Sequence, residues 1–478
     1  MKMKRVVTFL LLFITFTAQA QQRWNLRTVV DYAMANNITV KLSEVQTRLS
    51  ALTYKQSRLS RIPNLDLTNN LGFNSGNNQD PTTFQRVTQT YISAGFQLQS
   101  SADIFNFFSK QNIIAANKWE LEASFANVDK LKNDIALTAA NGYLQVLLAT
   151  EQQNITTVQV QQTAAQLANT RKIVDAGALP ELNASQLEAQ LALDSVNYIT
   201  AKGNLSQAIL LLKSYMNIDA AAPFEVDAPP VESIPVEAIA DLQPENVYLL
   251  AMANQPLQRY NELRLKAAEK NRLATKAQML PSLTAYGTIG SNYIKARTPA
   301  YFPVPGSFNQ TGLFVNVSGV PYSVVSPALA QNGYNKSAPF NTQFSDNLRQ
   351  SAGLSLNVPI LNGYNRRGNY ERSLLNISSL QLQKLQDDQK LKQDIYQAYT
   401  SAMIALEKFN ASKKTVSINE TTYNYATKRF DVGILSTFDL ITTKNNLLRA
   451  KLEYTINRFD YVFKMKVLEF YKGLGLKL

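Results

Sequence analysis

The chain has 478 residues, a formal net charge of +13, 45% hydrophobic residues, no cysteine and no histidine. Such a composition belongs to an ordered protein with two or three ordinary domains or one elongated domain. Without cysteine there is no disulfide, thiolate metal site or thiol nucleophile, and without histidine the commonest general base and metal ligand are missing. These absences argue against an enzyme. The positive charge is spread without long basic runs, which argues against nucleic-acid binding.

Residues 1–20 have the pattern of a secretory signal peptide. A basic start, MKMKR, is followed by an apolar run at Val6–Phe16 and by AQA at residues 18–20, a small-residue cleavage pattern. The apolar run is shorter than the about 20 residues that a membrane-spanning helix needs, and no later run reaches about 18. We therefore expect an exported mature chain starting near Gln21, which is either soluble outside the cytoplasm or inserted as β-strands.

The rest of the chain reads as a tandem repeat. VDAGALPELNAS, residues 174–185, and FDVGILSTFDLI, residues 430–441, share Asp, Gly and Leu at a constant offset of 256. The same offset relates Ile104, Phe108, Tyr143, Lys172, Leu191, Tyr198 and Tyr215 to Ile360, Tyr364, Tyr399, Lys428, Leu447, Tyr454 and Tyr471. A proline-rich connector occupies residues 218–246. We predict a first structural repeat over residues 21–230 and a second over residues 231–478.

In chain order, the first repeat begins with a predicted helix over residues 26–61, ended by Pro63. Period-two alternation then predicts strands of about ten residues near 65–74 and 91–98, separated by a polar loop over 75–87. Residues 109–175 contain no proline, and their coiled-coil spacing predicts a long helix. Gly177 reverses the chain, because glycine supplies the left-handed cap of a helix end, and a returning helix starts near residue 182.

The second repeat follows the same plan. We predict a helix over residues 246–279, strands near 283–289 and 348–358, and between them a long extracellular loop over 295–346 that is rich in Gly, Pro, Asn and Ser. A long helix over 365–431, a reversal at Gly433 and a returning helix from about 438 complete the second hairpin.

The predicted strands are apolar on one face and polar on the other. One face carries Leu65, Phe73, Phe96, Leu283 and Leu354, and the other carries Asp66, Asn70, Gln97, Ser355 and Asn357. This pattern suits tilted strands across an outer membrane, although a half-buried strand of a soluble sheet alternates in the same way. Four strands cannot close a membrane barrel, and an open edge in lipid leaves backbone groups unpaired. Copies must therefore share a barrel, with eight strands in a dimer or twelve in a trimer.

Taken together, the signal peptide, the tandem repeat, two strands per half and the two glycine-turn hairpins resemble the TolC-like outer-membrane efflux proteins. VPILNGYNRRGN, residues 358–369, is similar to the strand-to-helix junction usual there, whereas the first half reads SSADIFN where that junction usually has proline and glycine. The resemblance covers essentially the mature chain. It implies an α+β membrane protein: a long α-helical barrel with coiled-coil hairpins plus four transmembrane β-strands per protomer, which form a twelve-stranded β-barrel in a trimer.

The resemblance also implies a function and partners. The protein would be the outer-membrane exit duct of a tripartite efflux or type I secretion system, located in the cell outer membrane and extending into the periplasm. The homotrimer would contact outer-membrane lipid, a periplasmic adaptor (membrane fusion) protein and an inner-membrane transporter of the RND or ABC type. The alternatives are a periplasmic coiled-coil scaffold and a secreted hydrolase, and the missing histidine and cysteine weigh against the hydrolase.

Site residues follow from the resemblance as well. The expected adaptor-docking tips are Gly177, Ala178, Leu179, Gly433, Ile434 and Leu435. Asp439 matches an acidic position of the family's periplasmic entrance, Asn183 is its repeat position, and Phe430 matches an aromatic position that restrains the inner hairpin. Three Asp439 carboxylates around a threefold axis would favour cations, but Ser436 and Asp439 also form an ordinary helix-start signal. We predict no catalytic residue, cofactor or metal site. GYNRRGNY, residues 363–370, does not match a nucleotide-binding loop, because Asn369 stands where a phosphate loop needs lysine. The acidic residues at the turns, Asp175, Glu181, Asp431 and Asp439, are typical of helix caps or solvated side chains.

Overall fold

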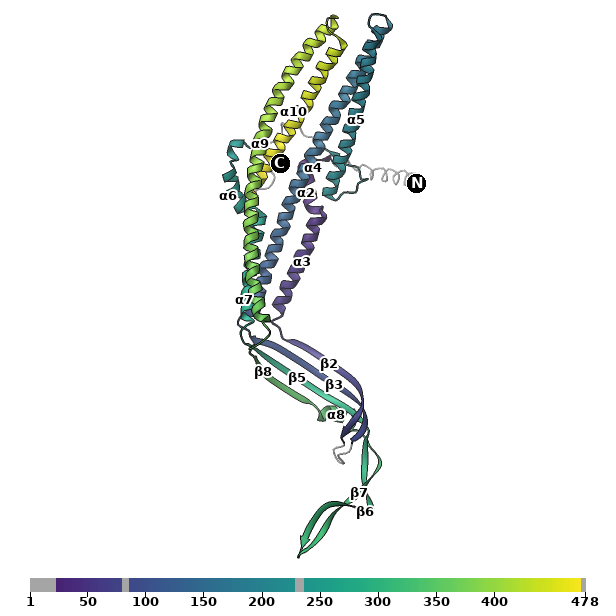
Figure 1. Ribbon diagram of the computed structural model, residues 1–478, viewed down its shortest axis with the longest axis vertical. Coiled ribbons are helices and arrows are strands. Elements are labelled where there is room, and N and C mark those ends of the chain that lie inside the picture. Colours follow the sequence, from purple (N-terminus) through teal and green to yellow (C-terminus); the bar gives the residue numbers. More distant parts are fainter. Residues whose placement is uncertain (1–22, 80–85, 228–235, 474–478) are drawn as a thin grey trace, which may run out of the picture. The chain divides into compact units, whose positions relative to one another are not determined.

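The structure is a computed structural model of the chain and describes residues 23–79, 86–227 and 236–473. The expected signal peptide lies outside the described residues. The chain divides into two compact units (Figure 1). The helical unit holds the described residues of Met1–Tyr54, Ala115–Lys270 and Leu374–Leu478, and the strand unit holds those of Lys55–Ile114 and Asn271–Ser373.

Two helical hairpins dominate the helical unit. The first joins α4 (Ser109–Asp175) to α5 (Glu181–Met216), and the second joins α9 (Asn365–Asp431) to α10 (Thr437–Tyr471). The long helices predicted over residues 109–175 and 365–431 are thereby confirmed. Shorter elements pack beside them: β1 (Arg23–Trp24), α2 (Leu26–Asn36), α3 (Ile38–Leu59), β4 (Glu225–Val226), η2 (Ile239–Asp241), α6 (Pro244–Asn254) and α7 (Pro256–Ala277).

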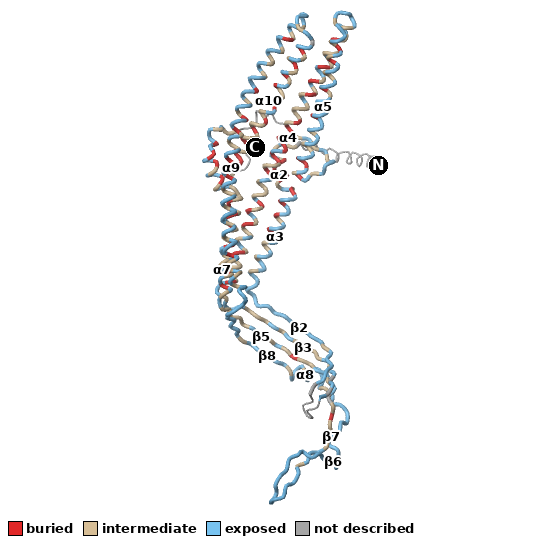
Figure 2. Tube along the Cα trace, in the orientation of Figure 1, coloured by how far each residue is buried: buried red, intermediate tan, exposed pale blue. Residues whose placement is uncertain are grey.

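The helical unit contains two equivalent cores. In the first, α2 packs against α4 and α5 around the buried residues Ala139, Val146 and Leu212. In the second, α6 packs against α9 and α10 around Ile395, Ala402 and Leu468, which lie at the same offset of 256. Figure 2 shows buried residues as red segments along the helices. The same packing is therefore built twice, with different side chains at two of these three positions.

Each repeat also interrupts its first helix, where the sequence predicted one continuous helix. Asn37 is extended between α2 and α3, and Gln255 is extended between α6 and α7. Proline disfavours helical geometry in the preceding residue, which explains the second break before Pro256. The amide of Asn37 donates to the Tyr215 carbonyl at 2.9 Å, and that of Gln255 donates to the Tyr471 carbonyl at 3.2 Å. Each break thus ties a first helix to the end of its own hairpin.

The strand unit contains a four-stranded antiparallel sheet in the order β2 (Asn64–Gln79), β3 (Arg86–Phe105), β5 (Ser282–Ala296) and β8 (Arg349–Asn357). Residues that pair directly across the strands share a face. Leu67 pairs with Leu98, Leu98 pairs with Ile289, and Ala285 pairs with Leu354, so one face is apolar. The pairing puts the predicted apolar set on this face and the predicted polar set on the other, which confirms the separation of the two sets.

Residues 295–346, which the sequence predicted as a long loop, contain secondary structure of their own. The segment contains a second antiparallel pair, β6 (Thr298–Val317) with β7 (Val320–Asn335), and a short helix, α8 (Phe340–Asp346). Pro303, Pro321 and Pro327 lie within these strands. Proline removes a ladder hydrogen bond and is uncommon in strands, so these segments lack the sequence pattern by which a strand is recognised. The β6–β7 pair also has three register shifts along its length.

The two strand-to-helix junctions share one geometry despite their different sequences. Gly363 and Tyr364, before α9, have φ values of 60° and 66°. Phe107 and Phe108, before α4, lie at the equivalent repeat positions and have φ values of 49° and 64°. Left-handed backbone is unfavourable for a bulky residue, so the first junction is held by its surroundings.

Candidate functional site

Both hairpin tips end in the same hydrogen-bonded cap. Gly177 and Gly433 have φ values of 73° and 76°, which glycine adopts without a Cβ clash. The cap bonds are Gly177 N to Val174 O (2.8 Å), Ala178 N to Ile173 O (3.0 Å), Gly433 N to Phe430 O (2.8 Å) and Ile434 N to Arg429 O (2.9 Å). This pair of bonds is a Schellman motif. The structure thus confirms the predicted reversals at Gly177 and Gly433, and it confirms that each glycine is the left-handed cap of its helix.

The predicted tip residues differ in exposure. Ala178 is exposed and Ile434 is 67% exposed, whereas Leu179 and Leu435 are half-buried against the turns. Sequence reasoning missed two further apolar residues just past the turns, Leu182 and Phe438, which are both 64% exposed. They lie at equivalent repeat positions, so the offset of 256 was the signal that identifies them. Each tip therefore presents at least two exposed apolar side chains.

The first hairpin is clamped close to its tip by an arginine. Arg171 on α4 forms ion pairs with Glu181 and with Glu188 on α5, the latter at 2.5 Å. The hydrogen bond to Glu188, followed by that to Glu181, raises the pKa of Arg171 above its ordinary value. The second hairpin has an ion pair between Lys451 and Glu420, at 2.9 Å. Such exposed pairs contribute little to the free energy of folding.

Asp439 lies at the start of α10 and has a local partner. Ser436 caps the helix by accepting from Asp439 N at 3.1 Å, and its hydroxyl donates to the Asp439 carboxylate at 2.7 Å. This is the helix-start arrangement that the sequence allowed as the alternative to an entrance role. Asp439 is exposed, whereas Asn183 and Phe430 are half-buried.

A buried carboxylate on α5 joins the first hairpin internally. Asp194 is 1% exposed and accepts three side-chain hydrogen bonds. Gln159 donates to one carboxylate oxygen at 2.7 Å, Thr163 donates to the other at 2.6 Å, and Gln190 donates at 2.8 Å. Three donors compensate the loss of solvation that burial imposes on a carboxylate.

The second hairpin reaches this carboxylate through α10. Lys444 is buried and donates to Thr163 Oγ1 at 3.3 Å, while Asn445 donates to Gln190 at 3.3 Å. Burial lowers the pKa of Lys444, and the charge of Asp194 acts in the opposite direction. Polar side chains on three helices therefore couple the two hairpins of one chain. The sequence shows no motif for this network, because its members lie on helices that are distant in sequence.

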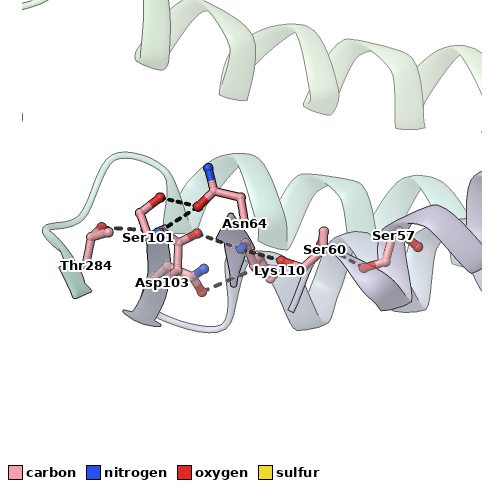
Figure 3. A network of polar contacts seen from close by, with 8 residues as sticks. Ser57, Ser60, Asn64, Ser101, Asp103, Lys110 and Thr284 are labelled. Carbon is pink, nitrogen blue, oxygen red and sulfur yellow. Dashed lines mark hydrogen bonds and ion pairs between the residues drawn. The ribbon is translucent and has the colours of Figure 1, made fainter. Parts of the chain in front are cut away.

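The strand unit has its own polar network where the sheet joins the helices (Figure 3). Lys110 forms an ion pair with Asp103 at 2.9 Å and donates to the carbonyl of Ser60 at 2.7 Å. The Asn64 side chain accepts from the backbone and the hydroxyl of Ser101, both at 2.7 Å. These bonds connect β2, β3 and α4, and the ion pair between Asp103 and Lys110 spans the left-handed pair of the first junction in sequence.

Among residues 23–79, 86–227 and 236–473, no helix combines the length and apolar character needed to cross a membrane. The family model described as outer membrane efflux protein matches residues 29–217 and 247–461, which together are most of the chain. The chain belongs to the outer membrane efflux protein family. A search of curated proteins gave no match.

Solved structures show the same fold at low sequence identity. CusC, studied for folding and transmembrane channel formation, is 15% identical with a TM-score of 0.73, covering 95% of this chain and 92% of its own. The CmeC outer membrane channel of Campylobacter jejuni is 16% identical with a TM-score of 0.71, covering 95% and 87%. The open state of the MtrE outer membrane channel of Neisseria gonorrhoeae is 16% identical with a TM-score of 0.66, covering 94% and 89%.

The family assignment answers the main questions raised by the sequence. The fold class is that of these channels, an α+β membrane protein with an α-helical barrel and a β-barrel. The protein is an outer-membrane efflux duct that extends into the periplasm, and it is a transport conduit, not an enzyme.

Proposed function

We propose that the duct is a homotrimer in which β8 of each copy pairs with β2 of the next. The observation that carries this proposal is the strand order β2-β3-β5-β8. The sheet is antiparallel throughout, so β8 of one copy and β2 of another run in opposite directions when the two sheets are placed edge to edge. Among the described strands, β2 pairs with β3 alone and β8 with β5 alone. Backbone groups left open in lipid are costly, and pairing between copies satisfies them.

Disulfide cross-linking tests the proposed seam in a chain that has no native cysteine. Cysteine at Asp66 on β2, combined with cysteine at Ser355 or Asn357 on β8, should give covalent dimers and trimers on a non-reducing gel. The control combines Gln97→Cys with Thr288→Cys, two positions on neighbouring strands of one chain, and should give no species larger than a monomer. A ladder that stops at the dimer would contradict the trimer, and an absence of oligomers from every β2–β8 combination would contradict the seam.

We also propose that the hairpin tips dock a periplasmic adaptor protein, which connects the duct to an inner-membrane pump of the RND or ABC type. Six tip residues form the docking surface: Gly177, Ala178, Leu179, Gly433, Ile434 and Leu435. The exposed side chains of Ile434, Leu182 and Phe438 support it, because apolar groups exposed together mark an interaction surface. Membership of an efflux family supports partners of this kind.

Acidic substitutions at the tips test the docking proposal. Leu179→Asp and Leu435→Asp should abolish efflux in cells while leaving the amount of trimer unchanged. Gln161→Asp introduces the same charge at an exposed position of α4 and should leave efflux intact. Dye accumulation and the amount of trimer are measured for all three variants. If both tip variants export normally, the apolar side chains do not dock a partner, and the glycines alone explain the sequence of the turn.

We propose further that Asp439, with Asn183 and Phe430 near the other helix ends, belongs to the periplasmic entrance. The exposure of Asp439 supports this proposal. Three such carboxylates around a threefold axis would attract cations and hinder anions at a narrow mouth.

We finally propose that residues 21–230 and 231–478 are structural repeats of one unit. The two equivalent cores, the paired helix breaks at Asn37 and Gln255, and the matching tip caps support this boundary.

A further inference from the structure

The short helix α8 covers part of the apolar face of the sheet. Phe340 and Phe344 on α8 pack against Phe96, with ring centroids 5.9 and 5.8 Å apart, and Phe340 lies 5.5 Å from Tyr293. Phe96 and Tyr293 belong to the apolar face by strand register. They lie toward the end of the sheet that is farther from the strand-to-helix junctions. Phe340 and Phe344 nevertheless remain 46% and 38% exposed.

The polar side chains beside and on α8 are turned toward the edge of β5. Beyond Gly290, which pairs with Arg349, β5 continues without β8 as a partner. The bonds at this edge are Asn347 Nδ2 to Asn292 O (2.7 Å), Ile294 N to Gln343 Oε1 (3.0 Å), Gln343 Nε2 to Ile294 O (3.0 Å), Ala296 N to Ser337 Oγ (3.0 Å) and Ser337 Oγ to Ala296 O (2.9 Å). These side chains form the hydrogen bonds that a neighbouring strand would otherwise form with the backbone of β5. They fix α8 with its phenylalanines directed away from this edge.

A second aromatic cluster lies at the opposite end of the sheet. Phe105 is 4.8 Å from Phe107 and 6.0 Å from Phe108, measured between ring centroids. Phe105 pairs with Leu283, and Tyr293 follows ten residues later on β5. At about 3.3 Å per residue and a strand tilt of roughly 40°, ten residues rise by about 25 Å. That rise equals the height of the apolar band between the aromatic girdles of an outer-membrane barrel.

Basic residues accompany the cluster around α8. Lys295 pairs with Ile92 and shares the apolar face with Tyr293, and Lys336 directly precedes the edge-capping Ser337; both lysines are exposed. Residues 292–349 contain four basic residues, Lys295, Arg297, Lys336 and Arg349, and one acidic residue, Asp346. Lysine beside aromatic side chains at a membrane boundary suits an anionic lipid headgroup.

We propose that α8 is a membrane-interface helix that binds anionic lipid headgroups in the outer leaflet. Phe340 and Phe344 enter the edge of the acyl region, while Lys295 and Lys336 lie at the level of the lipid phosphates. Lipid is the occupant because α8 continues the apolar face of a sheet that belongs to an outer-membrane channel. In addition, the aromatic residues around α8 lie about one hydrocarbon thickness from the aromatic cluster of Phe105 and Phe107. The inference rests on the proposed barrel, in which this face meets lipid.

Depth-dependent quenching tests the position of α8. Phe344→Cys carries an environment-sensitive fluorophore, and the trimer is reconstituted in vesicles that contain lipid with a nitroxide at acyl carbon 5 or at carbon 12. The shallow nitroxide should quench this label more strongly. Asn316→Cys, in the exposed β6–β7 hairpin, should be quenched by neither, and Leu71→Cys, on the apolar face, by both. A label at position 344 that resembles the one at 316, or is quenched mainly by the deep nitroxide, would overturn the proposal. Loss of quenching at Leu71 would instead contradict the barrel itself.

Lipid selectivity tests the headgroup contacts. Nitroxide-labelled phosphatidylglycerol should quench the label at position 344 more than labelled phosphatidylcholine does, reflecting an enrichment of about two- to fivefold, since one basic side chain near a membrane is worth up to about fivefold. The double variant Lys295→Gln/Lys336→Gln should bring the ratio to about one. Lys41→Gln/Lys55→Gln removes the same charge from α3 and should leave the ratio unchanged. Equal ratios in wild type and in both double variants would contradict the headgroup site.

Discussion

Replacing Asp194 by asparagine should weaken the contact between the two hairpins. The carboxylate accepts three bonds of 2.6–2.8 Å, two of them on one oxygen. Asparagine keeps one acceptor oxygen, so the bond from Thr163 loses its charged acceptor, at about 1.5–3 kcal/mol. The buried ammonium of Lys444 also loses the negative charge of Asp194, which favours its protonated form. Removing one member of a buried charge pair costs about 3–5 kcal/mol at most, so we expect Asp194→Asn to lower the free energy of unfolding by about 2–4 kcal/mol.

The loss should depend on pH in a defined direction. Burial already lowers the pKa of Lys444 from 10.5, and removal of the Asp194 charge lowers it further. Between the lowered pKa of the folded state and 10.5, the unfolded chain binds more protons than the folded chain, so stability rises with pH. Relative to wild type, Asp194→Asn should therefore be less destabilised at pH 10 than at pH 7.

Thermal unfolding of the purified oligomer, followed by circular dichroism at one scan rate, checks both parts of this prediction. Asp31→Asn, which removes an exposed carboxylate, is the matched control and should change stability by no more than about 0.5 kcal/mol. Lys444→Gln added to Asp194→Asn should cost less than the sum of the two single variants, because the two charges compensate each other. The reasoning is refuted if Asp194→Asn behaves like the control, or if its deficit is equal at the two pH values.

Three further predictions concern the tips, the entrance and the sheet. Gly177→Ala should lower stability by about 1 kcal/mol, because the φ of Gly177 is 73°. Gly203→Ala is the control: this residue lies inside α5 with open space around it, so the substitution should raise stability by about 0.5–1 kcal/mol. Equal thermal midpoints of the two variants would contradict the role of the cap. Asp439→Asn should weaken the cation preference of the reconstituted channel, read from the reversal potential in a salt gradient, with nearly unchanged thermal stability. Reduced stability with an unchanged reversal potential would leave Asp439 as a helix cap only. A membrane-impermeant thiol reagent should label Asn70→Cys but not Leu71→Cys, and equal labelling would contradict the lipid-facing assignment.

Features with a local cause could be predicted from the sequence. The long helices α4 and α9 begin and end where predicted, because they contain no proline and each ends at a glycine that must be left-handed. The two faces of the sheet followed from period-two alternation, because a strand alternates its side chains whatever its partner is. The repeat offset linked the two hairpins, and it also places Leu182 and Phe438 at equivalent positions.

Features with a distant cause could not be predicted. Asp194 looks like a solvated helix residue, whereas its donors Gln159 and Thr163 lie on α4, more than 30 residues away. The β6–β7 pair is rich in proline and irregular in register, so its strands lack the pattern by which strands are recognised. At the break between α2 and α3, Asn37 contacts Tyr215, which is distant in sequence. Phe107 is left-handed at a position where the second repeat has Gly363, and its own sequence gives no sign of this conformation. In each case tertiary contacts override local preference.

Conductance of the purified oligomer in a planar lipid bilayer tests the central claim, that this chain forms the outer-membrane duct of an efflux system, most directly. The account predicts discrete single-channel steps of small conductance with a preference for cations. Oligomers that insert into the bilayer with intact β-structure and yet never conduct ions above the lipid baseline would contradict it.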